Sequence, residues 1–131
     1  MGKIIWKSSE KSLNEVKDSK ITELDMACKN SILGYFKAIV NDIEYDFSYD
    51  EQAQSRFNGI AGAFSLGLIT EVVWTAHKDN ERYRLILTKD QFISVSAKAL
   101  LHQSSNVEKF NQLLIAVNNA ATTDEVSAIV W

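Results

Sequence analysis

The side chains that most often perform catalysis or hold metals are few in this chain and lie far apart. It has one cysteine, Cys28, and two histidines, His77 and His102. Neither histidine belongs to an HExxH motif and no second cysteine completes a CxxC pair, so the sequence predicts no zinc site. No Gly-x-Ser-x-Gly turn is present for a serine hydrolase. We therefore expect surface or partner-facing histidines, and no catalytic, metal-binding or cofactor-binding residue.

A second set of chemically capable residues is an acidic group, Asp42, Glu44, Asp46, Asp50 and Glu51. Glycosidases need two opposed carboxylates across a cleft. A calcium loop needs oxygen ligands at alternate positions, a glycine and a final glutamate. The calcium-loop pattern is absent, and a glycosidase carboxylate pair is usual in larger chains. We therefore expect these acidic residues to lie on a solvated strand face.

Two further sets of residues are candidates for recognising a partner. Tyrosine is favoured in protein contacts, so the aromatic stretch offers candidate interface residues, Tyr35, Tyr45 and Tyr49. Burial in the core is the competing interpretation. Basic residues do not alternate with these rings, as a platform for single-stranded nucleic acid would need. Under an alternative hypothesis, an anionic ligand has three candidate residues, Arg56, Arg82 and Arg84.

The beginning of the chain differs from the rest. A short apolar cluster, Ile4, Ile5 and Trp6, is followed by the polar stretch KSSEKS. We predict an N-terminal arm over residues 1–17 and a single domain over residues 18–131. The cluster is a candidate contact with a neighbouring subunit, and docking on its own domain is the competing interpretation.

The hydrophobic pattern begins with a helix over residues 18–33, or from Leu13. Its apolar stripe holds Ile21, Leu24, Cys28 and Ile32. Gly34 is expected to end this helix with a positive φ. Because Cys28 lies on the apolar stripe, we expect an inert core thiol.

Two hairpins and three more helices are predicted after Gly34. Apolar residues alternate on both sides of Asn41-Asp42, a plausible two-residue turn. A second hairpin is predicted over residues 70–87, with a loop at 77–81. Side chains suited to capping precede the helices, at Asp50, Thr88 and Thr122. We expect the second of these helices to break near residues 104–106 and the last to cover residues 126–131.

The order α-β-β-α-β-β-α-α lacks the strand–helix–strand alternation of parallel sheets, so it predicts an α+β fold. Helices should pack on antiparallel β-hairpins. The chain has 131 residues and a net charge of -3, and its 14 basic residues are dispersed. We therefore expect no nucleic-acid partner. No apolar run approaches the ~20 residues that span a bilayer, so we expect no membrane partner.

Residues spread along the chain carry a family resemblance. They are Leu24, Ala27, Cys28, Gly34, Phe36, Tyr45, Asp50, Gln54, Asn58 and Gly59, followed by Val73-Trp74, the TKDQ turn at Thr88 and the closing TTDEVSAIVW. In this order and spacing, roughly residues 21–131 resemble a domain of unknown function found in phage and prophage tail proteins, including tail-fibre proteins. The resemblance implies a tail context and carries no chemistry to transfer.

The resemblance and the absence of catalytic motifs together predict a non-enzymatic structural or assembly protein of a phage or prophage tail. Its partners would be other tail proteins or further copies of itself, and it would lie in the cytoplasm of the host bacterium or in the virion. The alternative is a small phage-encoded anti-defence effector that binds a host protein or a nucleotide-type ligand. Such an effector should have a cleft in which arginines converge.

Overall fold

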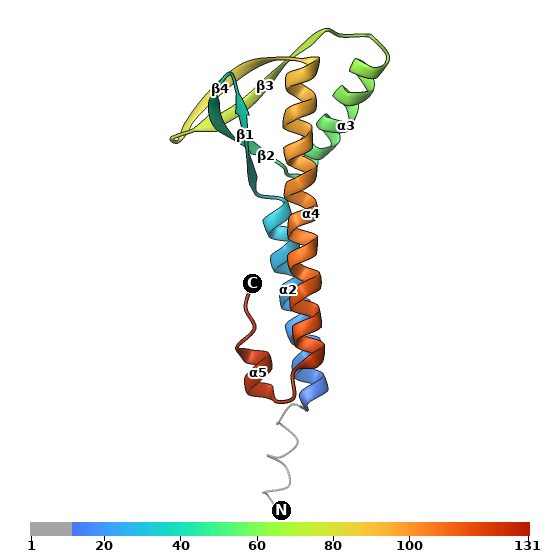
Figure 1. Ribbon diagram of the computed structural model, residues 1–131, viewed down its shortest axis with the longest axis vertical. Coiled ribbons are helices and arrows are strands. Elements are labelled where there is room, and N and C mark those ends of the chain that lie inside the picture. Colours follow the sequence, from blue (N-terminus) through green and yellow to red (C-terminus); the bar gives the residue numbers. More distant parts are fainter. Residues whose placement is uncertain (1–11) are drawn as a thin grey trace, which may run out of the picture. The chain divides into compact units, whose positions relative to one another are not determined.

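The computed structural model describes residues 12–131, which divide into two compact units (Figure 1). Unit 1 holds the described residues up to Lys29 together with Val107–Trp131, and unit 2 holds Asn30–Asn106. The predicted apolar cluster Ile4, Ile5 and Trp6 lies outside the described residues. The first helix begins at Leu13, the earlier of its two predicted starts, so residues 13–17 of the predicted arm are helical.

The described elements follow one another in the predicted order, and the α+β class is confirmed. They are α2 (Leu13–Ile32), β1 (Tyr35–Val40), β2 (Ile43–Ser48), α3 (Glu51–Ser65), β3 (Glu71–Lys78), β4 (Glu81–Thr88), α4 (Lys89–Asn119) and α5 (Thr123–Ser127). Among these residues, no helix has both the length and the apolar character that a membrane crossing requires.

Unit 2 is built on a four-stranded antiparallel sheet with the strand order β1-β2-β3-β4. Two-residue turns close its hairpins, with φ values of 51° and 66° at Asn41 and Asp42 and of 52° and 63° at Asp79 and Asn80. Two consecutive positive φ values define a type I′ turn, whose twist matches that of the strands. The first turn is therefore confirmed, whereas the loop predicted at 77–81 is wrong because β3 and β4 extend into it.

One face of this sheet forms the core of unit 2. Alternate strand residues on this face pack against α3 and the first part of α4. The helices therefore lie on one side of the sheet (Figure 1). The ring centroid of Phe57 on α3 lies 4.5 Å from that of Trp74 on β3 and 5.8 Å from that of Phe92 on α4. Since aromatic pairs at such distances add to the energy of area burial, Phe57 joins both helices to the sheet.

Local hydrogen bonds fix where the helices of unit 2 begin. Asp50 accepts from the backbone N–H of Ala53 at 2.8 Å, as predicted for the N-cap of α3. The predicted capping box also forms, because the backbone N–H groups of Thr88 and Gln91 each donate to the other residue's side chain. Asp50 therefore sets the start of α3, and the capping box sets where β4 ends and α4 begins.

Two predictions about helix ends are wrong. α4 does not break at residues 104–106, because Ser104 and Asn106 donate from their side chains to carbonyls of the preceding turn while the helix continues. Gly34 does not have a positive φ; among the described glycines only Gly67 does. A Cβ atom at Gly34 would lie 3.3 Å from the Ser31 carbonyl oxygen, so close approach is the reason for glycine there.

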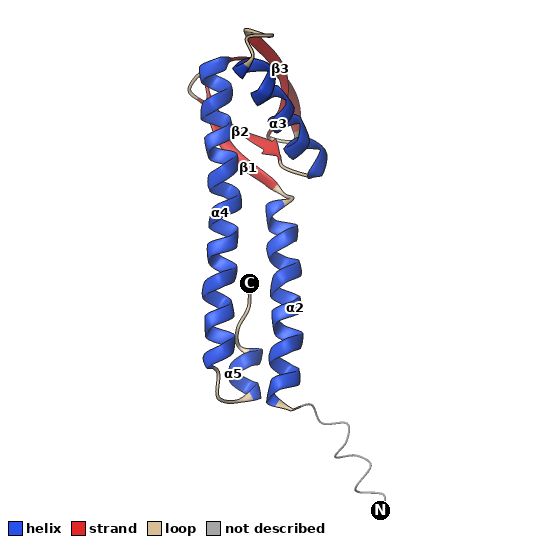
Figure 2. Ribbon diagram, turned by 90° about the vertical axis from the view of Figure 1, so that its right-hand side faces the viewer, coloured by secondary structure: helices blue, strands red, loops and turns tan. Residues whose placement is uncertain are grey.

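Unit 1 combines parts of α2 and α4 with α5 (Figure 2). Its buried residues are Leu24, Cys28, Val117, Ala120 and Val126. Lys17 donates to the Asn118 carbonyl at 3.0 Å. The hydroxyl of Thr122 accepts from the Glu125 N–H, so α5 begins at Thr123 and covers Thr123–Ser127 instead of the predicted 126–131.

Replacing Phe57 with alanine tests the role of this ring. Phe57→Ala should lower the free energy of unfolding by about 3–5 kcal/mol, because it removes a buried ring between three elements. Urea titration followed by circular dichroism measures the loss. The control is Leu66→Ala, whose side chain is 76% exposed and whose loss should cost less than about 0.5 kcal/mol. Equal losses in both variants would contradict this role.

Candidate functional site

The face of the sheet opposite the core is the first candidate site, and we call it the open face. It holds the strand residues that alternate with the core residues. Its apolar members are Tyr35, exposed by 59%, Ile39 by 61%, Val73 by 40% and Ile86 by 59%. Val73 and Ile86 are register neighbours, whereas the polar residues of β2 lie next to Tyr35 and Ile39. Exposed apolar side chains gathered on one face, with polar residues around them, are a feature of protein interaction sites.

A row of polar residues crosses the open face over four strands. Lys37, Asp46, His77 and Arg82 are direct neighbours in the strand register. The Lys37 ammonium donates to the Asp46 carboxylate at 3.0 Å, and this bond raises the pKa of Lys37. The Tyr35 ring meets the His77 ring edge-on, with centroids 5.5 Å apart. Tyr35, Asp46 and His77 share a shallow hollow of about 370 Å³ with Lys78 and Asn80.

The three predicted interface tyrosines do not share this face. Tyr35 is exposed, whereas Tyr45 and Tyr49 are buried to 8% and 6% exposure. The Tyr45 ring packs on the ring of Tyr83, at 5.6 Å. The Tyr49 hydroxyl donates to the Gln103 side chain at 3.1 Å. Tyr45 and Tyr49 therefore hold the core together, and Tyr35 alone of the three offers a ring to a partner.

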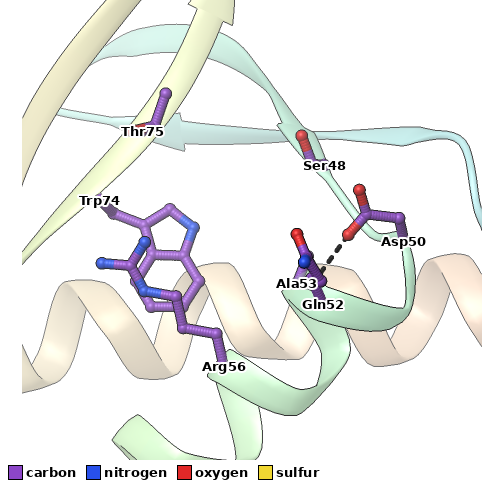
Figure 3. Close-up of a pocket in the computed structure, with 7 residues that line it drawn as sticks. All are labelled: Ser48, Asp50, Gln52, Ala53, Arg56, Trp74 and Thr75. Carbon is purple, nitrogen blue, oxygen red and sulfur yellow. Dashed lines mark hydrogen bonds between the residues drawn. The ribbon is translucent and has the colours of Figure 1, made fainter.

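A polar pocket of about 230 Å³ lies where β2 and β3 separate (Figure 3). It is lined by Ser48, Asp50, Gln52, Ala53, Arg56, Trp74 and Thr75. The Arg56 guanidinium lies 4.5 Å from the Trp74 ring centroid and donates to the Val73 carbonyl at 2.9 Å. The register between β2 and β3 is formed at Asp46 and His77, so Arg56 supplies a partner to a strand carbonyl beyond the end of that pairing.

The three candidate arginines are not gathered in one site. Arg56 lines the polar pocket, whereas Arg82 and Arg84 lie on β4 and are not among its lining residues. In the register, Arg82 is opposite His77 and Arg84 is opposite Thr75, on the open face. The structure thus brings Arg82 into the polar row and keeps Arg56 with Trp74.

The histidines and the cysteine have separate surroundings. His102 Nε2 lies 3.0 Å from the Ile32 carbonyl oxygen, so this nitrogen carries the proton and donates. The His102 ring also packs beside Phe36 and Tyr49, so this residue is half-buried, as His77 is. Burial raises the pKa of the buried Cys28 thiol, and Asp25 raises it further. Across residues 12–131, no group of three or more metal-binding side chains gathers.

Sequence reasoning did not find an apolar groove between α3 and α4. The groove has a volume of about 300 Å³ and is lined by Ala61, Phe64, Ser65, Lys89, Phe92, Ile93, Ser96, Ala97 and Leu100. Ile93 and Leu100 are 53% and 65% exposed. Their seven-residue spacing, off the buried stripe of α4, was a signal that could have indicated it.

The chain matches the family described as "Domain of unknown function (DUF4376)" over residues 15–130, and it belongs to that family. Searches with the chain find no matching curated protein and no matching solved structure. Family membership confirms the predicted domain of unknown function and assigns no chemistry to the residues above.

The buried Cys28 thiol should react slowly in the folded chain. Its burial and raised pKa both lower the amount of accessible thiolate, so labelling by iodoacetamide should be at least ~10-fold slower than in urea. A matched control is Met26→Cys in a Cys28→Ser chain, because Met26 is 59% exposed on the same helix and a thiol there should label quickly. Labelling of Cys28 as fast as that of the control thiol would contradict its burial.

The same shift sets a pH dependence. A raised thiol pKa stabilises the fold below the unfolded value of ~8.5, and this contribution is lost as the pH rises through the raised value. The free energy of unfolding should therefore fall less between pH 8 and 10 in Cys28→Ala than in the wild type, by urea titration. Equal slopes in the two chains would contradict the raised pKa of this thiol.

Proposed function

We propose that this protein is a non-enzymatic assembly component of a phage or prophage tail that binds another tail protein through the open face. The observation that carries the proposal is that four apolar side chains stay exposed on one face of the sheet while α3 and α4 cover most of the other face. The tail context is supported by the sequence resemblance alone. In this account the chain is made in the host cytoplasm and then enters the particle.

The chemistry of the open face suits a protein partner. Tyr35 supplies a rigid amphipathic ring, and Ile39 and Val73 supply aliphatic contact area. The polar row contains both signs of charge, with Lys37 beside Asp46 and Arg82 beside His77. Such a row fixes the orientation of a partner more than it adds to affinity.

The test follows the protein into purified particles. Mass spectrometry should find it in tails or tail-assembly intermediates. The variants Tyr35→Ala and Val73→Asp should reduce its incorporation about tenfold or more, because they remove exposed interface residues. Leu66→Asp is the control, since Leu66 lies beyond the end of α3 and outside the open face; it should be incorporated normally.

Two results would contradict the tail proposal. One is absence of the protein from particles and intermediates, and the other is normal incorporation of both open-face variants. Circular dichroism of each purified variant ensures that loss of incorporation is not loss of folding.

The anti-defence effector is the second candidate function, and the polar pocket is what favours it. Arg56 lines it together with Ser48 and Thr75, and its guanidinium suits an anionic, nucleotide-type ligand. Asp50 lines the same pocket, and its carboxylate opposes such a ligand. Calorimetry with mononucleotides and cyclic dinucleotides separates the two functions: micromolar binding that disappears in Arg56→Ala would favour the effector, and no binding would favour the tail component.

A further inference from the structure

We propose that the outer edge of β4 pairs with the same edge of a second copy, which joins two four-stranded sheets into one continuous antiparallel sheet. This inference deepens the proposed function, on which it rests for its biological setting, by naming a second copy as one partner. The open face would remain available to a different protein, because edge pairing uses the backbone groups at the side of the sheet.

The first observation is that β4 is an edge strand with regular pairing along its whole length. It has eight residues, and each is paired to β3 in an unbroken register from Glu81 with Lys78 to Thr88 with Glu71. Its neighbour in the sheet is β3, and its other side has no strand in the described sheet. In an antiparallel sheet every second residue of such a strand directs its N–H and C=O outward.

The second observation is that the second half of β4 lacks the features that protect natural edge strands. Proteins block edges with short strands, bulges, prolines and charged side chains, especially lysines, and the three charges of β4 all lie in its first half. β1, at the other edge, has six residues and carries Lys37 near its centre. The second half of β4 reads Leu85-Ile86-Leu87-Thr88 and carries no charge, and Ile86 is 59% exposed. β4 is therefore the edge that needs a cover.

The third observation is that β4 is complementary to itself. Antiparallel pairing about a two-fold axis brings together residues that point to the same face of the sheet. Centred on Leu85, the pairing gives three facing pairs on each side of that residue: Arg84 with Ile86, Tyr83 with Leu87 and Arg82 with Thr88. Glu81, the first residue of β4, would lie near Lys89 of the other copy, which begins α4, and the two side chains carry opposite charges.

Neighbouring registers are poorer. A shift centred on Arg84 places Arg84 opposite itself, and like charges directly opposite are destabilising. A shift centred on Ile86 pairs only residues 84–88 and so loses backbone bonds at both ends. The register centred on Leu85 is the longest of these that opposes no like charges, and it buries more of Tyr83, which is 36% exposed in the single chain.

Sedimentation equilibrium on the full chain tests the pairing. We expect a monomer–dimer equilibrium with a dissociation constant on the order of micromolar, as for a small interface. Ile86→Lys should raise that constant about 30-fold or more, because it places a lysine opposite Arg84 of the other copy. The matched control is Ile39→Lys, which has the same change, the same face and 61% exposure but lies on β1; it should shift the constant by less than about threefold.

Crosslinking tests the register. In a Cys28→Ser chain, Leu85→Cys should form a disulfide-linked dimer under mild oxidation, because the introduced thiol would face the same thiol of the other copy. Ile39→Cys in the same background should not. Three results would overturn the inference: a wild type that stays monomeric up to about 0.5 mM, a concentration far above the dissociation constant of a specific contact, equal weakening by Ile39→Lys and Ile86→Lys, or a dimer that Leu85→Cys does not crosslink.

These outcomes are separate from those for the tail. A chain that pairs through β4 but is absent from particles keeps the pairing and contradicts the tail function. A chain that stays monomeric but still enters particles keeps the tail function and contradicts the pairing.

Discussion

Unit 2 depends on the contact between Phe57 and Trp74, whose ring centroids lie 4.5 Å apart. Trp74 is also covered by the Arg56 guanidinium, which donates to the neighbouring Val73 carbonyl. Two adjacent residues of α3 therefore pack on β3. One of them, Arg56, also gives the Val73 carbonyl a hydrogen-bond partner at the place where β3 is no longer paired to β2.

Packing on a single face explains why this sheet is suited to contacts. Both helices of unit 2 lie on the face that holds Phe57 and Trp74, so the other face carries its apolar residues into solvent. An antiparallel sheet tolerates this, because the alternation of side chains separates a buried face from a solvated one. β4 is the last strand of this sheet, and its outer side has no neighbouring strand among the described residues. The proposed partners, a tail protein and a second copy, thus use different parts of the sheet.

The sequence was a sufficient guide wherever local chemistry decides the structure. Asp50 and Thr88 were correctly predicted as caps, and Asn41-Asp42 as a turn, since each acts on its own few residues. The tyrosines show where this stops. Tyr45 and Tyr35 both lie on strands in which apolar residues alternate with others. The register pairs Tyr45 with Ala38 and Tyr35 with Ser48, so the two rings point to opposite faces of the sheet.

Which alternate residues are buried is decided by the helices, through contacts far apart in the sequence. The same holds for Arg56, whose place beside Trp74 required the position of α3, and for His102, whose ring is held by the Ile32 carbonyl.

The central claim is that one face of the sheet is packed and the other is open. NMR of methyl groups with a soluble paramagnetic agent, on dilute protein, measures this directly. The account predicts strong relaxation of Ile39, Val73 and Ile86 and protection of Val40, Leu87 and Val95; protection of Ile39 and Val73 would contradict it.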